Sequence, residues 1–444
     1  AALRAEKLAQ TQEKQQVLGA MDHDDWGMIL PPPHLRMLIE AVSSAGVPIT
    51  DCLLERVVAR ANQPSGGVCG PLSVGHNFRA LLMAHPAYID PNSSLAGGYM
   101  VNFMSYRKPH WPAELDYSAL QPAHERYGLF PGIGGAQHFC QDLQIGLDLG
   151  WGGLLNKIEY YRLENDADAE DFYAGLAAVV EGIQNWVGRT AATARALAVE
   201  ERDPVLRANL TEIAEINARL VTDPPQTFRE ACQWILWFQI TARMYNGSGS
   251  LGRLDTLLYP YYAHDVAMGI LDDEEAIFHV ACLLLRDTAY LQLGGPDADG
   301  RDVTNPVSFL VLEAAHRLKI PANVGICVGE EVDAELLRRG VEILLTDKCG
   351  MPKFLGIEQT AKGFARNGYP LALGRERAYS GCQWSAIPGR EYTMNDMVKI
   401  NFAKVFEVAL WEMLDDRKNS PSTERLWTLF VTHLTRAVEV IAAG

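Results

Sequence analysis

Short apolar runs alternate with helical segments between residues 305 and 357, and this alternation restricts the fold more than any other feature of the chain. The run Asn323-Val-Gly-Ile-Cys-Val328 predicts a buried strand, and Lys353-Phe-Leu-Gly-Ile357 predicts another. Between these runs, an N-terminal cap at Asp333 opens a predicted helix. The apolar run 305–312 leads into a further helix. Alternating strands and helices are typical of an α/β barrel or a layered sheet.

The remainder of the chain is predicted to be mostly helical. Residues 21–130 are rich in Pro, Gly and aromatic residues, which predicts helices joined by irregular connections. We therefore expect a mostly helical N-terminal region over 1–130 and a second region over 131–444. Apolar residues at helical spacing predict helices over 1–20, 167–222, 227–243 and 270–293.

The composition favours a globular protein and excludes some partners. Hydrophobic residues make up 48% of the 444 residues and charged residues 21%, which suffices for a large core. The net charge of −16, from 39 basic and 55 acidic residues, argues against a nucleic-acid partner. No uninterrupted apolar run reaches membrane-spanning length and no signal-peptide pattern is visible, so we expect a cytoplasmic protein.

The cysteines are scattered singly, which suggests a reducing compartment and not a disulfide framework. No CxxC pair is present, so the sequence predicts no zinc or iron–sulfur site, and we expect no bound metal. The eight positions are 52, 69, 140, 232, 282, 327, 349 and 382.

Two familiar motifs are excluded by their context. The segment Gly247-Ser-Gly-Ser-Leu-Gly252 satisfies GxGxxG, but a predicted helix precedes it where a dinucleotide site needs a strand. The serines Ser248 and Ser385 do not lie in GxSxG, so a hydrolase elbow is not predicted either.

Cys382 is the residue that most directly suggests chemistry. It lies in Tyr379-Ser-Gly-Cys-Gln-Trp-Ser-Ala-Ile-Pro-Gly389, a predicted loop flanked by glycines, with Pro388 delaying the helical run expected to begin near Asn395. Most single cysteines are small buried hydrophobic residues. A cysteine at a loop tip is instead presented to a ligand, and we predict that role for Cys382.

Several segments, in order, resemble the pyruvate formate-lyase-like glycyl radical enzymes over about residues 130–412. The first is His138-Phe-Cys-Gln-Asp-Leu-Gln-Ile-Gly-Leu-Asp-Leu-Gly-Trp-Gly-Gly-Leu154, and the second is Gly252-Arg-Leu-Asp-Thr-Leu-Leu-Tyr-Pro-Tyr-Tyr-Ala-His-Asp265. Asp302-Val-Thr-Asn-Pro-Val-Ser-Phe-Leu-Val-Leu-Glu-Ala-Ala315 is similar to a family helix. Tyr379–Cys382, followed by 401–410, resembles the cysteine loop and its helix.

The resemblance implies a fold, a reaction type and partners. The fold would be half of a ten-stranded β/α barrel of glycyl radical enzyme type with surrounding helices. Cys382 would be the thiyl-radical residue, oxidised by a glycyl radical that a separate S-adenosylmethionine radical activase installs. The thiyl radical would then abstract a hydrogen from a small organic substrate in a dry pocket. A lyase of dehydratase or decarboxylase type in anaerobic metabolism follows from this resemblance, with no cofactor bound by this chain.

The chain departs from the family pattern beside the cysteine. Eliminases and many decarboxylases of the family carry a glutamate two residues after the cysteine, where this chain has Trp384. Tryptophan cannot act as a base, so proton transfer must be supplied elsewhere. Guesses for that role are Glu391, Asp396 and His264, although Glu391 and Asp396 fit a helix cap better. The double cysteine of formate-lyases is also missing, since a glycine precedes Cys382.

The remaining substrate contacts follow from the same resemblance. Small residues stand at Gly247 and Ser248, where diol dehydratases carry His-Ser, which suggests room for a larger or flatter substrate. Trp384 would offer a stacking face, and we expect Gln383 to contact substrate as well. We expect Arg253 and Asp255 to form a structural ion pair or to cap the helix over 254–259, and not to touch substrate.

The family's radical glycine sits in an RVxGY-like loop far beyond the cysteine. This chain has no such motif and runs only 62 residues past Cys382. Either a second polypeptide completes the barrel and carries the glycine, or the sequence is incomplete; the first alternative is slightly favoured. In both, an isolated half-barrel would expose an apolar edge and aggregate or be unstable.

Two other functions stay open. A non-catalytic scaffold or partner subunit would fit the loss of the glutamate and of the glycyl loop, whereas the intact cysteine loop argues against it. A cysteine-nucleophile enzyme lacks a histidine near Cys382 in sequence.

Overall fold

The computed structural model describes residues 1–18, 60–99, 118–131, 139–246, 249–287, 289–320, 322–381, 384–391 and 398–443. Within these ranges the chain forms two compact units. The larger comprises 1–109 and 138–392, and the smaller comprises 110–137 and 393–444. The domain boundary near residue 130 that the sequence suggests stays a prediction.

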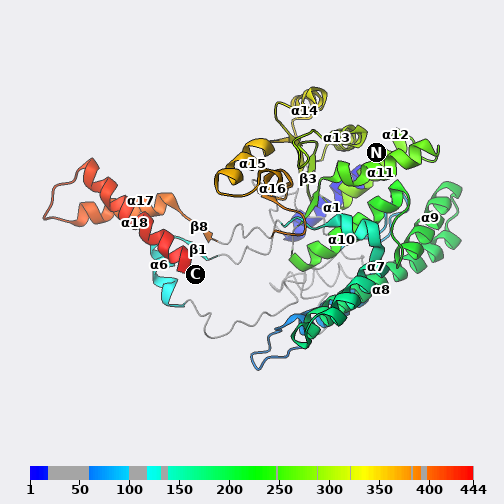
Figure 1. Cartoon of the computed structure of the whole chain (residues 1–444), viewed down its shortest axis with the longest axis horizontal. Coiled ribbons are helices and arrows are strands. Elements are labelled where there is room, and N and C mark those ends of the chain that lie inside the picture. The colour runs from blue at the N-terminus through cyan, green and yellow to red at the C-terminus, as the bar shows by residue number, and fades with distance from the viewer. Residues whose placement is uncertain are drawn as a thin grey trace. The chain divides into compact units, whose positions relative to one another are not determined.

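Helices make up most of the larger unit (Figure 1). The predicted helices over 1–20, 167–222 and 227–243 are confirmed, as α1, α8 with α9, and α10. In order, the helices of this unit are α1 (Ala2–Leu18), α4 (Pro71–Ala84), α7 (Leu143–Glu164), η4 (Ala167–Ala169), α8 (Glu170–Glu200), α9 (Pro204–Leu220), α10 (Phe228–Asn246), α11 (Leu254–Ala267), α12 (Asp273–Arg286), α13 (Pro306–Leu318), α14 (Ala334–Asp347), α15 (Ile357–Arg366) and α16 (Leu371–Arg375).

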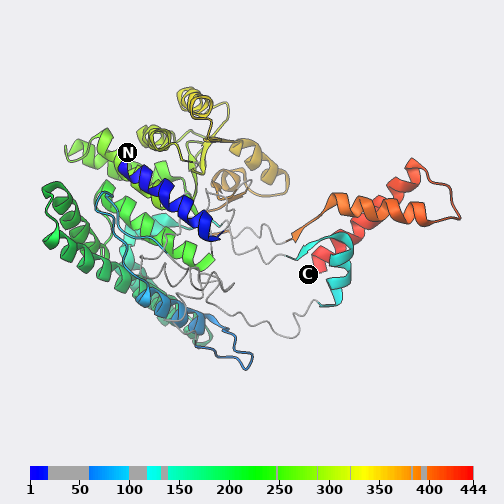
Figure 2. The ribbon, with the colours of Figure 1, turned by 180° about the vertical axis from the view of Figure 1, so that it is seen from behind.

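Small residues allow the long helices to pack closely. A side chain added at Gly75 of α4 would lie 2.4 Å from the carbonyl oxygen of Gly175 in α8. The buried face of α8 continues through Ile183 and Trp186 into the main core. Helix α1 packs beside α12 at the edge of this layer, where Figure 2 shows it in blue.

Four parallel strands form the sheet of this unit, in the order β2-β3-β4-β5. The predicted strands at 323–328 and 353–357 are confirmed. The prediction of helix through residue 293 is wrong at its end, because α12 stops at Arg286 and a strand follows. The strands are β2 (Ser250–Gly252), β3 (Tyr290–Leu293), β4 (Val324–Cys327) and β5 (Lys353–Leu355).

Side chains alternate between the two faces of this sheet, as strand geometry requires. Leu251, Leu291 and Ile326 lie on the outer face and belong to the same hydrophobic core as helices α10 to α13. A side chain at Gly340 of α14 would lie 2.3 Å from Ile326 and 3.6 Å from Phe354, so α14 packs closely on this face. Figure 1 shows α13 and α14 beside the sheet. The outer face is therefore apolar and covered by helices.

Polar caps set the boundaries of the crossover helices. The Asp333 carboxylate accepts hydrogen bonds from the first backbone N–H groups of α14, which confirms the predicted cap. Asn305 caps α13 in the same way, with Ser308 completing a capping box. The run 305–312 is thus the start of a helix and not an apolar segment that precedes one.

The smaller unit is a helical hairpin with a short sheet. It contains η2 (Ser118–Leu120), α6 (Gln121–Tyr127), β1 (Phe130–Pro131), β8 (Val398–Lys399), α17 (Phe402–Asp415) and α18 (Thr423–Ala443). The helical run expected to begin near Asn395 is present as α17, but its start is wrong, because 398–399 is a strand paired antiparallel with β1 and α17 begins at Phe402. Asn401 caps α17 by accepting from the backbone N–H of Lys404. Asp396, which the sequence predicts as a helix cap, lies outside the described residues.

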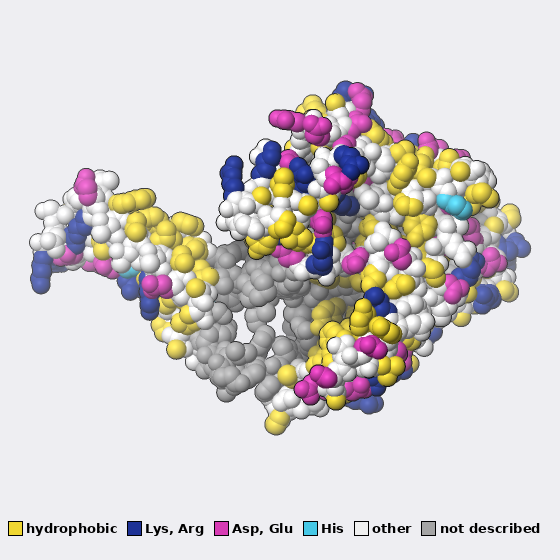
Figure 3. Space-filling view, in the orientation of Figure 1, with side chains coloured by type: hydrophobic (Ala, Val, Ile, Leu, Met, Phe, Trp, Pro, Cys, Tyr) yellow, Lys and Arg dark blue, Asp and Glu magenta, His cyan; other side chains and the backbone are white. Residues whose placement is uncertain are grey.

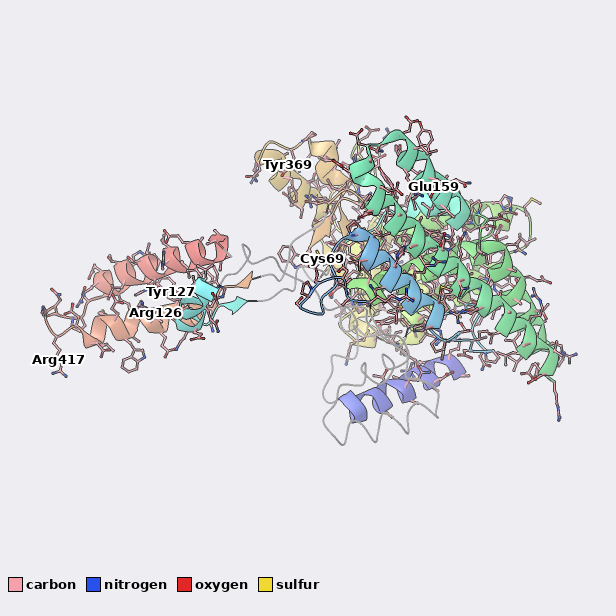
Figure 4. All side chains as sticks on the ribbon, turned by 90° about the horizontal axis from the view of Figure 1, so that it is seen from below. Cys69, Arg126, Tyr127, Glu159, Tyr369 and Arg417 are labelled. Carbon is pink, nitrogen blue, oxygen red and sulfur yellow. The ribbon has the colours of Figure 1, made fainter. Side chains whose placement is uncertain are left out.

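A chain of polar contacts, buried at Tyr127 and His433 and exposed at Glu412, joins the helices of the smaller unit. The Tyr127 hydroxyl lies 3.0 Å from His433 Nδ1, and His433 Nε2 lies 3.0 Å from Glu412. Arg126 also donates to Glu412, and Figure 4 shows Arg126 and Tyr127 on α6 beside α17 and α18. Figure 3 shows hydrophobic side chains over these two helices, which leave Phe402, Phe406, Trp411 and Trp427 exposed.

Helix α18 is long and apolar enough, by length and composition, to cross a membrane, and it is the one such helix in the described part of the chain. A single helix of this kind is weak evidence for a membrane span. Ala437 and Val440 form a buried stripe against α6 and α17, and Arg436 and Glu439 pair on the surface of the helix.

Candidate active site

The inner face of the parallel sheet is polar, in contrast to its outer face. Ser250, Tyr290 and Gln292 point to this side, and so does Lys353. Gly325 of β4 leaves a gap on the same side that Leu355 and Tyr379 fill, because a side chain there would lie 2.5 Å from Leu355 and 3.0 Å from Tyr379. The gap accommodates a segment that packs across the face.

That segment is the hairpin formed by β6 (Ala378–Tyr379) and β7 (Ser385–Ala386). Ser250 Oγ donates to the carbonyl oxygen of Tyr379 at 2.6 Å, and the backbone N–H of Tyr379 donates to Gln292 Oε1 at 3.0 Å. Both side chains are fully buried. Two sheet side chains thus satisfy both backbone polar groups of Tyr379, as a neighbouring strand would.

Two arginines hold the base of the hairpin. Arg253, which follows β2, donates to the carbonyl oxygens of Arg375 and Arg377, and it donates to that of Pro296 at 2.7 Å. Burial lowers the pKa of Arg253. Contrary to the prediction, its side chain neither pairs with Asp255 nor caps α11, and it bonds backbone carbonyl oxygens instead. Arg377 donates to the carbonyl oxygen of Ser385 and to Glu391, so it ties the two strands together.

These contacts define the direction in which the first strand of the hairpin runs relative to the strands of the sheet. The segment meets Arg253, beyond the carboxyl end of β2, through residues 375–377 and meets Ser250, the first residue of β2, through Tyr379. It therefore runs antiparallel to the strands, and Gly381 follows toward their amino ends. At the turn the backbone N–H of Trp384 donates to the carbonyl oxygen of Gly381 at 3.4 Å, and that of Ser380 donates to Trp384 at 3.0 Å.

Only one of the five predicted site residues is described. Trp384 is 39% exposed at the turn, where its ring is available for contact with a ligand. Cys382 and Gln383 lie outside the described residues, between Gly381 and Trp384. Gly247 and Ser248 also lie outside them, between α10 and Gly249. Ser250 lies two residues after Ser248 and Tyr379 three residues before Cys382, and these two described residues are joined by a hydrogen bond.

A buried polar network supports the start of β2. Gln141 donates to Gln239 of α10, and its own Oε1 accepts from the backbone N–H of Ser250 at 3.3 Å. Gln239 in turn donates to Asp287 at 3.0 Å, and Asp287 forms a buried ion pair of 2.7 Å with Arg243. The network connects the ends of α10 and α12 to the strand that holds the hairpin.

The amino edge of the sheet also carries a cation. Lys353, the first residue of β5, donates to Asn323 Oδ1 at 3.0 Å. Its ammonium lies 5.4 Å from the ring centre of Tyr290 and 6.0 Å from that of Tyr379. The two rings meet edge to face at 5.2 Å. The ring of Tyr379, which belongs to the hairpin, therefore contacts both the ring of Tyr290 and the ammonium of Lys353.

The guessed proton carriers lie in other settings. His264 is 60% exposed on α11, next to the buried Asp265. Glu391 bonds Arg377 and the backbone of Ile387 at the hairpin base, and Asp396 lies outside the described residues. Asp255 is fully buried and accepts from Ser308 and the backbone of Gly294, although burial raises its pKa. Among the described residues, no group of three metal-ligating side chains is present.

Ser250, Gln292 and Lys353 were not found by sequence reasoning. Each is one polar residue in a short apolar run, a pattern that also fits an ordinary edge strand. Gln292 lies inside a stretch whose apolar spacing predicts a helix. The alternation of polar and apolar residues that would indicate a strand is therefore not apparent there. Only the pairing of the strands shows that all three residues face the hairpin of β6 and β7.

Replacing Gln292 with methionine removes the acceptor for the Tyr379 N–H. We expect amide hydrogen exchange at Tyr379 to accelerate about fivefold, because the lost bond is worth about 1 kcal/mol. Exchange measured by NMR or mass spectrometry tests this. The same substitution at Gln144, an exposed residue of α7, serves as the control. Equal protection of Tyr379 in both variants would contradict the role assigned to Gln292.

The family model of the pyruvate formate lyase-like proteins matches residues 127–426 of the chain. This match covers more than half of the sequence, and the chain belongs to that family. The suspected resemblance is thereby confirmed.

Curated relatives include glycyl radical lyases and dehydratases. The isethionate sulfite-lyase of Nitratidesulfovibrio vulgaris is 25% identical over 272 residues, which are 56% of this chain and 33% of that protein. The trans-4-hydroxy-L-proline dehydratase of Clostridioides difficile is 26% identical over 321 residues, 63% of this chain and 40% of the relative. The chain thus spans between a third and two fifths of these relatives.

Solved structures agree on the fold. The glycerol dehydratase of Clostridium butyricum superposes with a TM-score of 0.74 at 19% identity, over 88% of this chain and 59% of that one. A glycyl radical enzyme from Archaeoglobus fulgidus gives 0.73 at 19% identity, over 97% and 63%. The parallel sheet with its helices is accordingly part of an α/β barrel of glycyl radical enzyme type, and it is not closed within the described residues.

Proposed function

We propose that this chain provides the hydrogen-abstracting cysteine of a glycyl radical lyase, with Cys382 as the radical carrier. The observation that supports this most directly is the hairpin on the polar inner face of the sheet, held by Ser250 and Gln292 on both sides of Tyr379. An anchored hairpin keeps its tip in place between the donor and the substrate, which a reaction between short-lived radicals requires. The family membership supports the same assignment.

In the proposed cycle, Cys382 takes one hydrogen atom from the substrate and returns a hydrogen atom to the product radical. A glycyl radical takes the hydrogen of the Cys382 S–H bond, and the resulting thiyl radical takes a hydrogen from a substrate carbon. The substrate radical breaks a C–O or C–C bond or rearranges, and the product radical recovers the hydrogen from Cys382. Gln383, Trp384, Gly247 and Ser248 would line the substrate. Because Trp384 offers no base, any proton transfer falls to another group.

The radical glycine and the rest of the barrel would come from outside these 444 residues. A second subunit or a further segment of the same polypeptide would supply both, and a radical S-adenosylmethionine activase would install the radical. We place the assembly in the cytoplasm, with a small organic substrate. Relatives that act as lyases and dehydratases support a dehydratase or decarboxylase type without specifying the substrate.

Anaerobic purification tests the proposal. The native protein is isolated with everything that stays bound, its components are identified by mass spectrometry, and the activase is added. We expect the RVxGY-like glycine loop on a stoichiometric partner or on additional residues of the same chain. Electron paramagnetic resonance should then show an organic radical that broadens when glycine is labelled with ¹³C. If neither the loop nor the radical is found, the scaffold function, favoured by Trp384 in place of glutamate, replaces this proposal.

A further inference from the structure

We propose that the groove between helices α4, α7, α8 and α10 binds a basic amphipathic helix of a partner protein. This binding surface is additional to the proposed radical chemistry and does not depend on it, because it is formed by described residues of the helical layer alone. Two features carry the inference: the apolar lining of the groove, and the acidic turn that joins α7 to α8.

The groove is apolar and contains space for side chains of another molecule. It encloses about 420 Å³, and each of the four helices contributes to its wall. Representative lining residues are Phe78 of α4, Trp151 of α7, Val180 of α8 and Phe238 of α10. Within the described residues, no charged side chain lines it. The groove therefore favours an apolar surface.

The polar groups of the groove do not fit a site for a small polar molecule. Such sites fix the orientation of the ligand with a few free polar groups. Thr241 of α10 lines the groove, but its hydroxyl already donates to the carbonyl oxygen of Trp237 at 2.8 Å. The apolar face of an amphipathic helix, which needs no such groups, is the better match.

Two apolar side chains of α8 mark the side on which the groove opens to solvent. Phe172 is 50% exposed and Leu176 is 38% exposed, and both line the groove. They are four residues apart, so they lie on the same face of the helix. Apolar side chains that continue from a groove onto the surface are typical of a site where another protein binds.

The turn between α7 and α8 gives this side of the groove a strong negative charge. Residues 157–172 carry six acidic and two basic side chains, a net charge of −4, which is a quarter of the net charge of the whole chain. Ile158 and Phe172, near the two ends of this stretch, both line the groove. Figure 1 shows α7 and α8 side by side, so the turn lies where these helices meet.

Most of this negative charge is not neutralised within the turn. Arg162 pairs with Glu159 at 3.2 Å and donates to Glu170 at 2.8 Å, which ties the end of α7 to the start of α8. Four exposed carboxylates have no ion-pair partner among the described residues: Glu164, Asp166, Asp168 and Asp171. Cations of a bound partner would supply the missing opposite charge.

The charge also decides between classes of partner. An acidic turn repels nucleic acids and anionic membrane surfaces, whereas it attracts a basic segment of a protein. An apolar groove beside acidic residues matches a helix with an apolar stripe and basic flanks. The alternative is an occupant that is only apolar, such as another segment of the same polypeptide, and the charge of that occupant would not matter.

Two synthetic helical peptides distinguish these possibilities. Both are about 18 residues long, so that each can form a helix, and both carry leucine along one face. The other face carries lysine in the first peptide and glutamate in the second. Binding of the fluorescently labelled peptides to the full chain is measured by fluorescence anisotropy. We expect the Leu/Lys peptide to bind at least about tenfold more tightly than the Leu/Glu peptide.

A matched pair of variants tests the groove itself. Leu176→Glu introduces a charge into the apolar lining and should weaken binding of the Leu/Lys peptide about tenfold, because a desolvated charge is costly. Leu163→Glu adds the same charge in the acidic turn, at a residue that is 84% exposed and does not line the groove. It should leave binding unchanged or strengthen it. Circular dichroism checks that both variants are folded.

A second pair of variants tests the charge. Asp166→Asn combined with Asp168→Asn should weaken binding of the Leu/Lys peptide about fivefold, because exposed charges act through water. Glu330→Gln combined with Glu331→Gln removes two exposed charges after β4 and should have no effect. All four residues are exposed, so these proteins should fold even if Leu176→Glu does not.

Four results would overturn the inference. These are no binding of the Leu/Lys peptide, equal binding of the two peptides, equal effects of the two leucine substitutions, or equal effects of the two pairs of charge substitutions. Equal binding of the two peptides would show an apolar site that is indifferent to charge. Equal effects of the charge substitutions would mean that the peptide responds only to the overall negative charge of the chain.

Discussion

We expect the replacement of Cys382 with alanine to lower turnover of the activated enzyme by a factor of about a thousand or more, while the glycyl radical should still form. The physical reason is that the methyl group of alanine has a much stronger bond to hydrogen than a thiol has. The radical can then no longer pass from the glycine to the substrate. Replacing a single catalytic residue lowers turnover by this much in enzymes with covalent steps. Product formation and the radical signal are measured on the same anaerobic sample.

A different cysteine provides the matched control. Cys349 is a partly buried thiol between α14 and β5, on the edge of the main core. Cys349→Ala should retain turnover, which separates the loss of the reacting thiol from the loss of any thiol. Normal turnover in the Cys382→Ala protein would remove the radical assignment, and an unfolded variant would show itself by altered circular dichroism.

Asp287→Asn should lower the free energy of unfolding by about 3–5 kcal/mol, because this is the usual cost of breaking a buried ion pair. The Asp287 carboxylate is fully buried and accepts from Arg243 through Nε and Nη2 and from Gln239. The substitution removes the negative charge that faces the buried Arg243 guanidinium. Urea unfolding of the chain, followed by circular dichroism, gives the difference.

An exposed ion pair tests whether burial is the cause of the expected loss in the free energy of unfolding. Glu342 of α14 pairs with Arg338 on the surface, with side chains 43% and 60% exposed. Glu342→Gln makes the same exchange of carboxylate for amide and should change the free energy of unfolding by less than about 0.5 kcal/mol. Equal losses in the two variants would mean that the buried position of Asp287 does not decide its contribution.

Much of the fold follows from local sequence patterns. Asp333 and Asn305 are short polar side chains placed before apolar periodicity, and their caps begin α14 and α13. Apolar spacing likewise predicts the long helices α8, α9 and α10. These signals are local, because a cap or an amphipathic stripe depends on residues within a few positions of one another.

The predictions fail where strands are short. The sequence pattern predicts helix over 290–293 and over 398–399, yet both are strands. Two to four residues cannot display a period, so their conformation depends on the partner strand that accepts their hydrogen bonds. For the same reason, the sequence predicts only a loop where β6 and β7 form.

The sequence alone determined the family and drew attention to Cys382, because ordered motifs and a glycine-flanked cysteine are written in consecutive residues. Only the tertiary structure showed that Ser250, Gln292 and Lys353 face the hairpin beside it. These residues are up to about 100 positions apart from one another, and each sits in a short run with no distinctive pattern. Their common role arises when parallel strands align their side chains on one face, which depends on register between distant segments and not on local composition.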